Sequence, residues 1–292
     1  MQEAKLFTGQ SMLVDDEDSL GLIVNGIFEP EETYSILGLV RSGDRVLDIG
    51  ANVGYYTVLL AERVQSAGRI FAVEPNEANL QILDVNTRGW QIAERVQLFS
   101  CALSDAAGSA NLFLSSHNGG MHRMYSSVVC TDESVPVSVV RGDDLGLAPL
   151  DFIKIDIEGF EPRAFRGLQQ TLQDSPHVKI LSEFSPFSIL ESGDSPRDWL
   201  QWMQDLGFFP LALRDGRWSS DACTGLLDSV DKLEQLDFSS LIGSLKGLDN
   251  PTILDRVIQA GLIAGYERPI IENLFFARPP EIASIEALVM RS

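Results

Sequence analysis

The segment Asp48-Ile-Gly-Ala-Asn-Val-Gly54 constrains the fold more than any other stretch of this chain, because it joins a strand-like run to a helical one. Residues 45–49 are mostly apolar and predict a buried strand, while residues 55–64 predict an amphipathic helix. Gly50 and Gly54 let the backbone approach a ligand closely, since neither has a Cβ in the way. A strand, a glycine-bearing turn and a helix N-terminus in this order predict a nucleotide pocket.

The next strand, predicted over residues 69–74, ends in Glu74. Pro75 and Asn76 follow it, ending the strand and opening a second helix over residues 77–87. A carboxylate at the end of the second strand of a βαβ unit is placed to accept both ribose hydroxyls. The βαβ unit is therefore interpreted as the half of the fold that binds adenosine.

The glycine spacing separates two ligand classes. Dinucleotide-binding folds use G-x-G-x-x-G, whereas this turn has G-x-x-x-G preceded by Asp48. A carboxylate at this place repels pyrophosphate and attracts the α-ammonium group of S-adenosylmethionine, which favours that cofactor over NAD. The alternative is an ordinary tight turn that binds no ligand. The presence of a carboxylate at the end of each of the two strands, Asp48 and Glu74, argues against that alternative.

Composition limits the remaining possibilities. The chain has 292 residues, 45% of them hydrophobic, which is enough for one large domain or two small ones. Its 22 Lys and Arg against 42 Asp and Glu give a net charge of −20, which opposes binding to nucleic acid or to an anionic membrane. The N-terminus lacks a basic and apolar leader, and no apolar run is long enough to span a bilayer, so we expect a soluble cytoplasmic protein.

The cysteines and an acidic run near the N-terminus predict no functional site. Cys101, Cys130 and Cys223 are odd in number and widely spaced, which predicts buried reduced thiols rather than a disulfide or zinc site. The acidic run at residues 15–18 predicts a solvated face or a mobile arm.

Alternation of strand-like and helical runs continues along the chain and predicts an α/β fold with a doubly wound sheet. Further strands are predicted over residues 96–103, 151–157, 178–184, 208–213 and 273–277, and helices over residues 162–173 and 195–206. About sixty residues, mostly helical in pattern (225–246 and 250–264), separate the last two strands, and a connection this long is typically a lid or an inserted subdomain.

Several motifs together resemble the FkbM family of S-adenosylmethionine-dependent methyltransferases. They are G-I-F-E-P (26–30), V-L-D-I-G-A-N-V-G-Y-Y-T (46–57), F-A-V-E-P-N (71–76), A-L-S-D (102–105), F-I-K-I-D-I-E-G-F-E (152–161) and N-L-F-F (273–276). The resemblance implies a class I methyltransferase, Rossmann-like fold, with a doubly wound seven-stranded sheet whose last strand is antiparallel. It also implies O-methylation of a hydroxyl group on a sugar or natural product as the commonest activity.

The resemblance divides the chain into parts. Residues 1–40 are expected to form an N-terminal arm or cap, and residues 41–214 and 269–280 the Rossmann-like methyltransferase domain. Residues 215–268 are expected to be a helical insert or lid, and residues 281–292 a C-terminal tail. A hairpin is expected where the insert stands, so the insert is predicted to cover the acceptor site, and the identity of the acceptor stays open.

The resemblance also assigns cofactor contacts. It places Asp48, Gly50, Asn52 and Gly54 at the methionine end, Glu74 at the ribose, Ser104 and Asp105 near the adenine, and Asp156 facing the methyl group. The complete predicted cofactor set is Glu29, Asp48, Gly50, Asn52, Gly54, Tyr55, Thr57, Glu74, Pro75, Asn76, Ser104, Asp105 and Asp156.

Candidate catalytic groups follow the strand ends, where ligands bind in open α/β sheets. Asp156 is predicted as a base or hydroxyl anchor, with Lys154 on the same strand face tuning its charge, and a merely structural ion pair is the alternative. Glu183 is a second candidate, with capping of a helix or bonding to a loop as its alternative, and His122 is a third, with a solvated loop histidine as its alternative. No metal is required, although Asp156, Glu158 and Glu183 together suit Mg²⁺ bound with a diol substrate.

The sequence thus predicts an S-adenosylmethionine-dependent methyltransferase that methylates a hydroxyl on a small metabolite in natural-product biosynthesis. Carrier-tethered acceptors and N-methylation stay open, as does the oligomeric state, while nucleic acid and membrane partners are not expected. Two alternatives remain: a nicotinamide-dependent oxidoreductase, and a module that binds an adenosyl ligand without catalysis.

Overall fold

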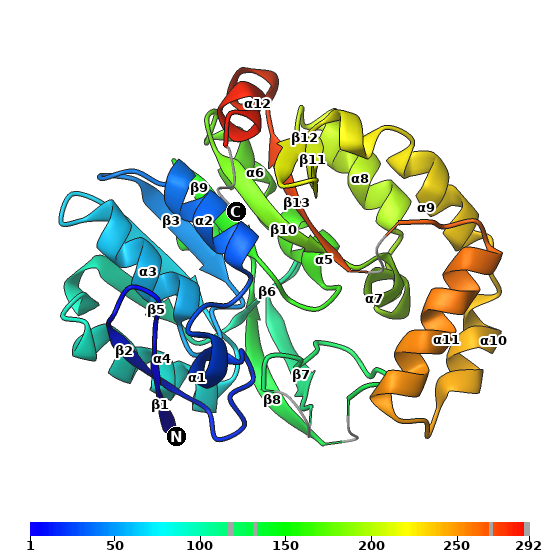
Figure 1. Ribbon diagram of the computed structural model, residues 1–292, viewed down its shortest axis with the longest axis horizontal. Helices are drawn as coiled ribbons and strands as arrows, with labels where there is room; N and C mark the ends of the chain where they lie inside the picture. The colour runs from blue at the N-terminus through cyan, green and yellow to red at the C-terminus, as the bar shows by residue number, and fades with distance from the viewer. Residues whose placement is uncertain (116–118, 131–132, 269–270, 289–292) are drawn as a thin grey trace.

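A mixed sheet forms the centre of the computed structural model, which describes residues 1–115, 119–130, 133–268 and 271–288 (Figure 1). Within these residues the sheet has eight strands in the order β12-β11-β13-β10-β9-β3-β4-β5. Their bounds are β3 Arg45–Ile49, β4 Arg69–Val73, β5 Val96–Phe99, β9 Phe152–Ile155, β10 Lys179–Phe184, β11 Phe209–Arg214, β12 Arg217–Ser219 and β13 Glu272–Ala277.

The pairing confirms the predicted fold class. Strands β3, β4, β5, β9 and β10 pair in parallel, and β13 runs antiparallel to both of its neighbours, β10 and β11. The short strand β12, which pairs antiparallel with β11 at the edge, adds to the seven predicted strands. It lies in the segment 215–268 that was expected to be a helical insert, just before the ranges predicted as helices.

Two apolar cores lie on the two faces of this sheet, because successive side chains of a strand point to opposite faces. Val46, Ile70 and Phe152 belong to one core, and the residues that follow each of them belong to the other. Burial on both faces explains why these strands are continuously apolar. The helices that cover the sheet include α2 Pro30–Leu39, α3 Tyr55–Val64, α4 Glu77–Gly89, α5 Glu161–Arg166, α6 Gln169–Gln173 and α8 Pro196–Asp205.

The predicted strand over residues 96–103 is wrong as a single element. After β5 the chain leaves the central sheet, and β6 (Ala102–Leu103) pairs with β8 (Ser134–Val140), which also pairs with β7 (Gly108–Phe113). The period of apolar residues is the same on both sides of the break, so it gives no sign that the strand changes partners.

The predicted helix over residues 162–173 is also broken. It divides into α5 and α6 around Gly167, where an added Cβ would lie 2.0 Å from the carbonyl oxygen of Ser104. A long-range approach of two backbones therefore interrupts a locally helical pattern. By contrast, α8 begins where predicted, because the Ser195 hydroxyl caps its N-terminus by accepting from the Asp198 amide.

The N-terminal arm is more ordered than its acidic run suggested. It forms a hairpin of β1 (Gln2–Lys5) and β2 (Ser11–Val14), followed by α1 (Leu22–Asn25). Asp15 accepts from the Ser19 amide, and Asp18 accepts from the Leu22 and Ile23 amides. These carboxylates organise turns instead of forming a freely mobile arm.

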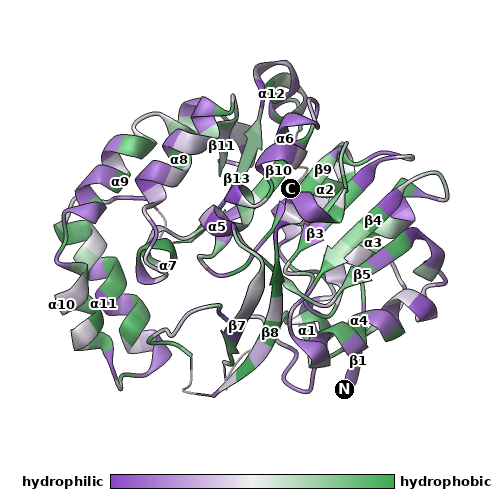
Figure 2. Cartoon of the chain, turned by 180° about the vertical axis from the view of Figure 1, so that it is seen from behind, coloured by the Kyte–Doolittle hydropathy of each residue, from purple (hydrophilic) through white to green (hydrophobic). Residues whose placement is uncertain are grey.

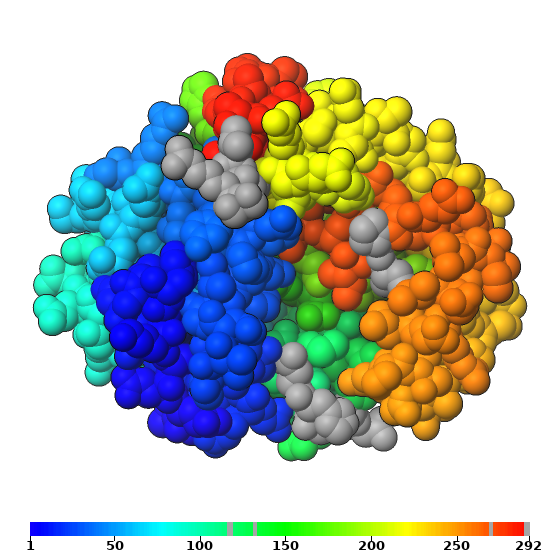
Figure 3. Space-filling view, in the orientation of Figure 1, coloured from blue at the N-terminus to red at the C-terminus, as the bar shows by residue number. Residues whose placement is uncertain are grey.

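Residues 215–268 contain α9 Leu226–Glu234, α10 Phe238–Leu245 and α11 Asn250–Ile263. With α8 they form an arc beside the sheet (Figure 1), and Figure 3 shows a hollow between α10–α11, in orange, and the blue N-terminal elements. The expected C-terminal tail contains α12 Pro279–Glu286, while residues 289–292 of that tail lie outside the described residues.

Two remaining sequence expectations can be compared with the structure. The cysteines are free thiols, but only Cys101 is buried, whereas Cys130 and Cys223 are partly exposed. In the part of the chain that the structure describes, no helix has both the length and the hydropathy required to cross a bilayer.

Candidate functional site

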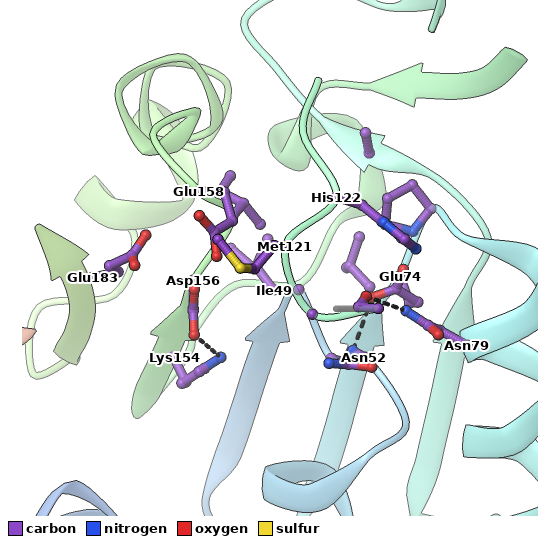
Figure 4. A pocket seen from close by; sticks show the side chains of 18 of the residues that line it. Ile49, Asn52, Glu74, Asn79, Met121, His122, Lys154, Asp156, Glu158 and Glu183 are labelled. Atoms are coloured by element: carbon purple, nitrogen blue, oxygen red, sulfur yellow. Dashed lines mark hydrogen bonds and ion pairs between the residues drawn. The ribbon is translucent and has the colours of Figure 1, made fainter. Parts of the chain in front are cut away.

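A cavity of about 200 Å³ lies at the carboxyl ends of β3, β4, β9 and β10 (Figure 4). It contains many of the predicted site residues on its wall: Glu29, Gly50, Asn52, Tyr55, Glu74, Pro75, His122, Lys154, Asp156, Glu158 and Glu183. The predicted residues that do not line it are Asp48, Gly54, Thr57, Asn76, Ser104 and Asp105. The topology thus gathers both the cofactor candidates and the carboxylate candidates around one space.

The turn after β3 owes its shape to its glycines. Gly50 has φ 75°, and an added Cβ there would lie 2.0 Å from the Asp156 carbonyl oxygen, so any side chain would push the two strand ends apart. Gly54 has φ 96°, and its Cβ would meet Leu83 at 2.3 Å. The groups that these two glycines approach closely are therefore the protein's own backbone and core, not only a ligand. Asn52 between them also adopts a left-handed conformation, with φ 51°.

Glu74 holds this turn from the end of β4. Its carboxylate oxygens accept from the Asn52 and Asn76 amides, both at 2.8 Å. Burial raises the pKa of Glu74 to about 7, despite the opposing effect of these two amides. Asn76 itself caps α4, since its side chain accepts from the Ala78 and Asn79 amides, so it serves the helix rather than the cavity.

Asp48 lies behind the cavity wall. It is fully buried, and one of its oxygens accepts from the Thr57 hydroxyl at 2.5 Å. Its other oxygen, Oδ1, has no hydrogen-bond partner among the described residues. Burial raises the pKa of Asp48, while the neighbouring Lys154 opposes that shift. The structure therefore places Asp48 and Thr57 as interior supports of the turn.

Ser104 and Asp105 do not lie on the cavity wall. Asp105 is half exposed and forms an ion pair with Arg166 at 3.7 Å, outside the cavity. Residues 101–103, just before them, line the cavity wall instead. The A-L-S-D motif (102–105) follows β5. The bend after β5 places Ser104 and Asp105 away from the cavity.

Three carboxylates converge at the ends of β9 and β10. Asp156, Glu158 and Glu183 each have an oxygen within 4.8 Å of the other two. Lys154 Nζ lies 3.3 Å from Asp156, and Arg123 Nη2 lies 3.0 Å from Glu158 (Figure 4 shows Lys154 and Asp156). Two members of this carboxylate cluster therefore have cationic partners.

Glu183, the third member, differs from the other two. It is buried, and its Oε2 has no hydrogen-bond partner among the described residues. Burial, together with the neighbouring carboxylates Glu158 and Asp156, raises the pKa of Glu183 well above its usual range. The predicted alternative, in which Glu183 caps a helix, is not what the structure shows, because Ser185 caps the following helix, α7 (Pro186–Glu191).

A second polar network joins the cluster to the N-terminal arm. Lys154 Nζ lies 5.1 Å from the centre of the Tyr56 ring, and the Tyr56 hydroxyl donates to Glu29 at 2.9 Å. Asn273 on β13 also donates to Glu29, at 3.2 Å. Burial, with a further contribution from Asp156, raises the pKa of Glu29 to about 7. The cavity is thus closed on this side by residues from distant parts of the chain.

His122 lines the cavity but does not join the carboxylate cluster. In Figure 4 it lies on the side of Glu74 and Asn79, away from Glu183. Its Nδ1 accepts from the Ser115 amide at 3.1 Å, and burial lowers its pKa, which keeps the ring neutral. Its position suits a contact with the adenosine side better than proton transfer at the cluster.

Sequence reasoning missed Arg123 and the role of Tyr56. Arg123 is buried and binds both Glu158 and Glu191, but it lies in a loop without a periodic pattern. A basic residue in a chain with so few of them was the available signal. Tyr56 is absent from the predicted cofactor set, although it is buried and lines the cavity.

The cluster offers the oxygen ligands that Mg²⁺ prefers. Lys154 and Arg123, however, already neutralise two of the three carboxylates at 3.3 and 3.0 Å. A cation bound here would have to share these carboxylates with two fixed positive charges, which weakens the case for a metal.

Comparisons with known proteins bear on the same residues. A family model described as the methyltransferase FkbM domain matches residues 48–210, which is more than half of the chain. No curated protein matches the sequence significantly.

Three solved structures illustrate the resemblance. The methyltransferase FkbM from Methylobacillus flagellatus is 22% identical with a TM-score of 0.39, and the match covers 55% of this chain and 40% of that one. An O-methyltransferase from Bacillus cereus in complex with SAH is 18% identical, covering 69% and 75% with a TM-score of 0.38. A SAM-dependent O-methyltransferase from Thermotoga maritima is 16% identical, covering 72% and 61% with a TM-score of 0.35.

Proposed function

This chain belongs to the FkbM methyltransferase family, whose methyl donor is S-adenosylmethionine, and we propose that it methylates a hydroxyl group of a small metabolite. When bound, the cofactor supplies an activated methyl group on a sulfonium centre. The protein must then bind that cofactor, align the acceptor and remove the hydroxyl proton.

The residues of the cavity suit this cofactor. Glu74 is buried at the strand end where ribose hydroxyls are bound in such folds, and it retains acceptor capacity beyond its two amide contacts. Asn52 lies on the cavity wall with a buried Oδ1 that has no partner among the described residues. An ammonium group would satisfy that oxygen, and the Glu29 carboxylate on the same cavity wall favours a positive charge.

The carboxylate cluster suits an acceptor hydroxyl. Lys154, held by Asp156 at 3.3 Å, donates a hydrogen bond to the acceptor oxygen and fixes its position, which leaves the hydroxyl hydrogen directed at Glu183. The acceptor oxygen forms a bond to the methyl carbon as the sulfur–carbon bond breaks, and the hydroxyl proton passes to Glu183. A carboxylate whose proton affinity is raised is a stronger base than an ordinary one. The unpartnered, buried Oε2 of Glu183 is the observation that carries this proposal.

The test has two stages. Calorimetric titration with S-adenosylhomocysteine, beside NADH, should show saturable binding of the thioether and none of NADH. A panel of hydroxylated metabolites and matched amines is then incubated with the enzyme and cofactor, and new methyl groups are assigned by NMR. Methoxy products that the Glu183→Gln variant fails to form support the proposal.

Other outcomes select the alternatives. N-methyl products would show that the acceptor is an amine, because the same alignment serves a nitrogen nucleophile. Thioether binding without turnover of any compound, unchanged in Glu183→Gln, would support a binding module. Binding of NADH in place of the thioether would refute the methyltransferase interpretation.

A further inference from the structure

A second cavity, of about 270 Å³, lies between the insert helices α10 and α11 on one side and α7 on the other. We call it the insert groove. On α10 its wall consists of Phe238, Leu241, Ile242 and Leu245, spaced three and four residues apart, so that one apolar stripe of the helix faces the groove. Only Leu245 of these four is fully buried. Figure 2 shows the hydrophobic residues of α10 and α11 in green.

Polar side chains on the wall of the insert groove are largely paired with one another. The Glu191 carboxylate accepts from Arg123 at 3.0 Å, from the Ser127 hydroxyl at 2.7 Å and from the Val128 amide at 2.8 Å. The Ser185 and Ser188 hydroxyls are bonded to each other at 2.9 Å. Within the described residues, every charged side chain on this wall is therefore in an ion pair, and the groove offers mainly apolar contacts.

The insert groove is adjacent to the catalytic cavity. Met121 lines both spaces, and Figure 4 shows it beside Asp156 and Glu158. Arg123 also connects them, because one guanidinium nitrogen binds Glu191 on the groove wall and another binds Glu158 on the cavity wall. The end of the groove at Met121 is therefore next to the carboxylate cluster.

We infer that the insert groove binds the uncharged, apolar body of the methyl acceptor, a hydroxylated aliphatic or alicyclic compound whose hydroxyl reaches the carboxylate cluster. This inference rests on the proposed function and adds the class of substrate to it. A sugar or another fully polar acceptor would leave its hydroxyls unpaired against this wall, which opposes binding.

The test uses the full chain with saturating S-adenosylhomocysteine and the neutral fluorophore N-phenyl-1-naphthylamine. Straight-chain primary alcohols from hexanol to dodecanol compete for the groove. We expect the fluorophore to be displaced, with a Kd that falls roughly three- to fourfold for each added methylene until the groove is filled.

Two matched variants locate the site. Leu254 lies on the groove wall and is 50% exposed, whereas Ile258, one turn further along α11, lies outside the groove lining and is 38% exposed. Leu254→Asp should weaken decanol binding at least tenfold, and Ile258→Asp should leave it unchanged. Ile242→Trp, which fills the groove, should affect dodecanol more than hexanol. Retained thioether binding shows that each variant is folded.

The failures are distinguishable. Equal effects of Leu254→Asp and Ile258→Asp, or alcohol affinity independent of chain length, would overturn the inference while leaving the proposed function in place. Length-dependent binding with no methylation of any hydroxyl would support the groove and contradict the proposed function. Self-association that Leu254→Asp abolishes, without displacement of the fluorophore, would identify the face as an interface between copies and overturn the inference.

Discussion

The cofactor side and the acceptor side of the cavity are built from different ranges of sequence. On the cofactor side, β3, the glycine turn, α3, β4 and α4 follow one another within residues 45–89. On the acceptor side, Arg123, Asp156, Glu183 and Glu191 come from four separated segments, and the insert groove adds α10 and α11. The cofactor side is therefore specified locally, whereas the acceptor side depends on how distant elements pack.

This difference implies that the two sides can be impaired separately. A substitution on the acceptor side should reduce turnover without affecting cofactor binding, and one on the cofactor side should reduce cofactor affinity. The predictions below test this separation, beginning with the largest expected effect.

Glu183→Gln should lower kcat by a factor of about 100 to 1,000, because it removes the proposed proton acceptor. In the parent enzyme kcat should rise with pH through the raised pKa of Glu183, since the carboxyl group must lose its proton before it can accept another. The pH dependence of kcat and titration with S-adenosylhomocysteine check this.

The thioether affinity of Glu183→Gln should match that of the parent enzyme within a factor of about two, since only turnover is lost. Loss of thioether binding in the variant would contradict the separation of the two sides. A pH profile that keeps the parent's rise would show that Glu183 is not the proton acceptor.

Glu74→Ala should weaken S-adenosylhomocysteine binding about 100-fold, because charge-assisted hydrogen bonds to two ribose hydroxyls are lost. Glu77→Ala is the matched control: Glu77 is an exposed residue three positions further on, at the start of α4, and its replacement should change affinity little.

Glu74→Gln serves as a second variant that keeps one carbonyl oxygen and so shows whether the turn itself collapses. An intermediate affinity is expected. Wild-type affinity in Glu74→Ala would show that the Glu74 carboxylate does not bind the ribose.

The stability of the free protein should fall as pH rises from about 5 to 8. The pKa of Glu74 is about 7 in the folded state and near 4.5 when exposed, so the folded state binds the extra proton in this window. The stabilisation is complete at low pH and is lost as pH passes through 7, and for Glu74 it amounts to at most about 3 kcal/mol.

Urea denaturation at several pH values measures the effect. Glu74→Gln should make this part of the profile less steep, because Glu29, whose pKa is also about 7, remains, whereas Glu77→Gln should leave the slope unchanged. A stability that increases over the same range would mean that Glu74 is already ionised in the free protein.

Chelation should have the smallest effect. Because Arg123 and Lys154 already lie beside two carboxylates of the cluster, EDTA should change kcat by less than about twofold. Initial rates with EDTA and with added Mg²⁺ check this. A rate that vanishes with EDTA and returns with Mg²⁺ would make Asp156, Glu158 and Glu183 a metal site.

The sequence predicted the strands and helices of the cofactor side well, for physical reasons. A strand, a turn and a helix are each recognised from neighbouring residues, and β3 and α3 occupy the residues predicted for them. The three carboxylates were also predicted to approach one another, because parallel strands end at the same edge of a sheet.

The failures concern contacts between distant residues. The break between α5 and α6 depends on a backbone approach between Gly167 and Ser104, and the exclusion of Asp105 from the cavity depends on Arg166. Arg123 gave no pattern at all, since its two partners lie 35 and 68 residues away. Propensity and periodicity describe a residue's neighbours in sequence, and these contacts are not of that kind.

The contact between Gly50 and the Asp156 carbonyl has a consequence for how such an enzyme changes over time. The turn proposed to receive the methyl donor and the strand end proposed to direct the acceptor hydroxyl approach each other through main chain, where a single added carbon atom does not fit. The proposed positions of donor and acceptor are thus both fixed relative to this one main-chain contact in the sheet. A change in the insert would alter the acceptor that fits while leaving this main-chain contact, and with it the distance across which the methyl group travels, the same.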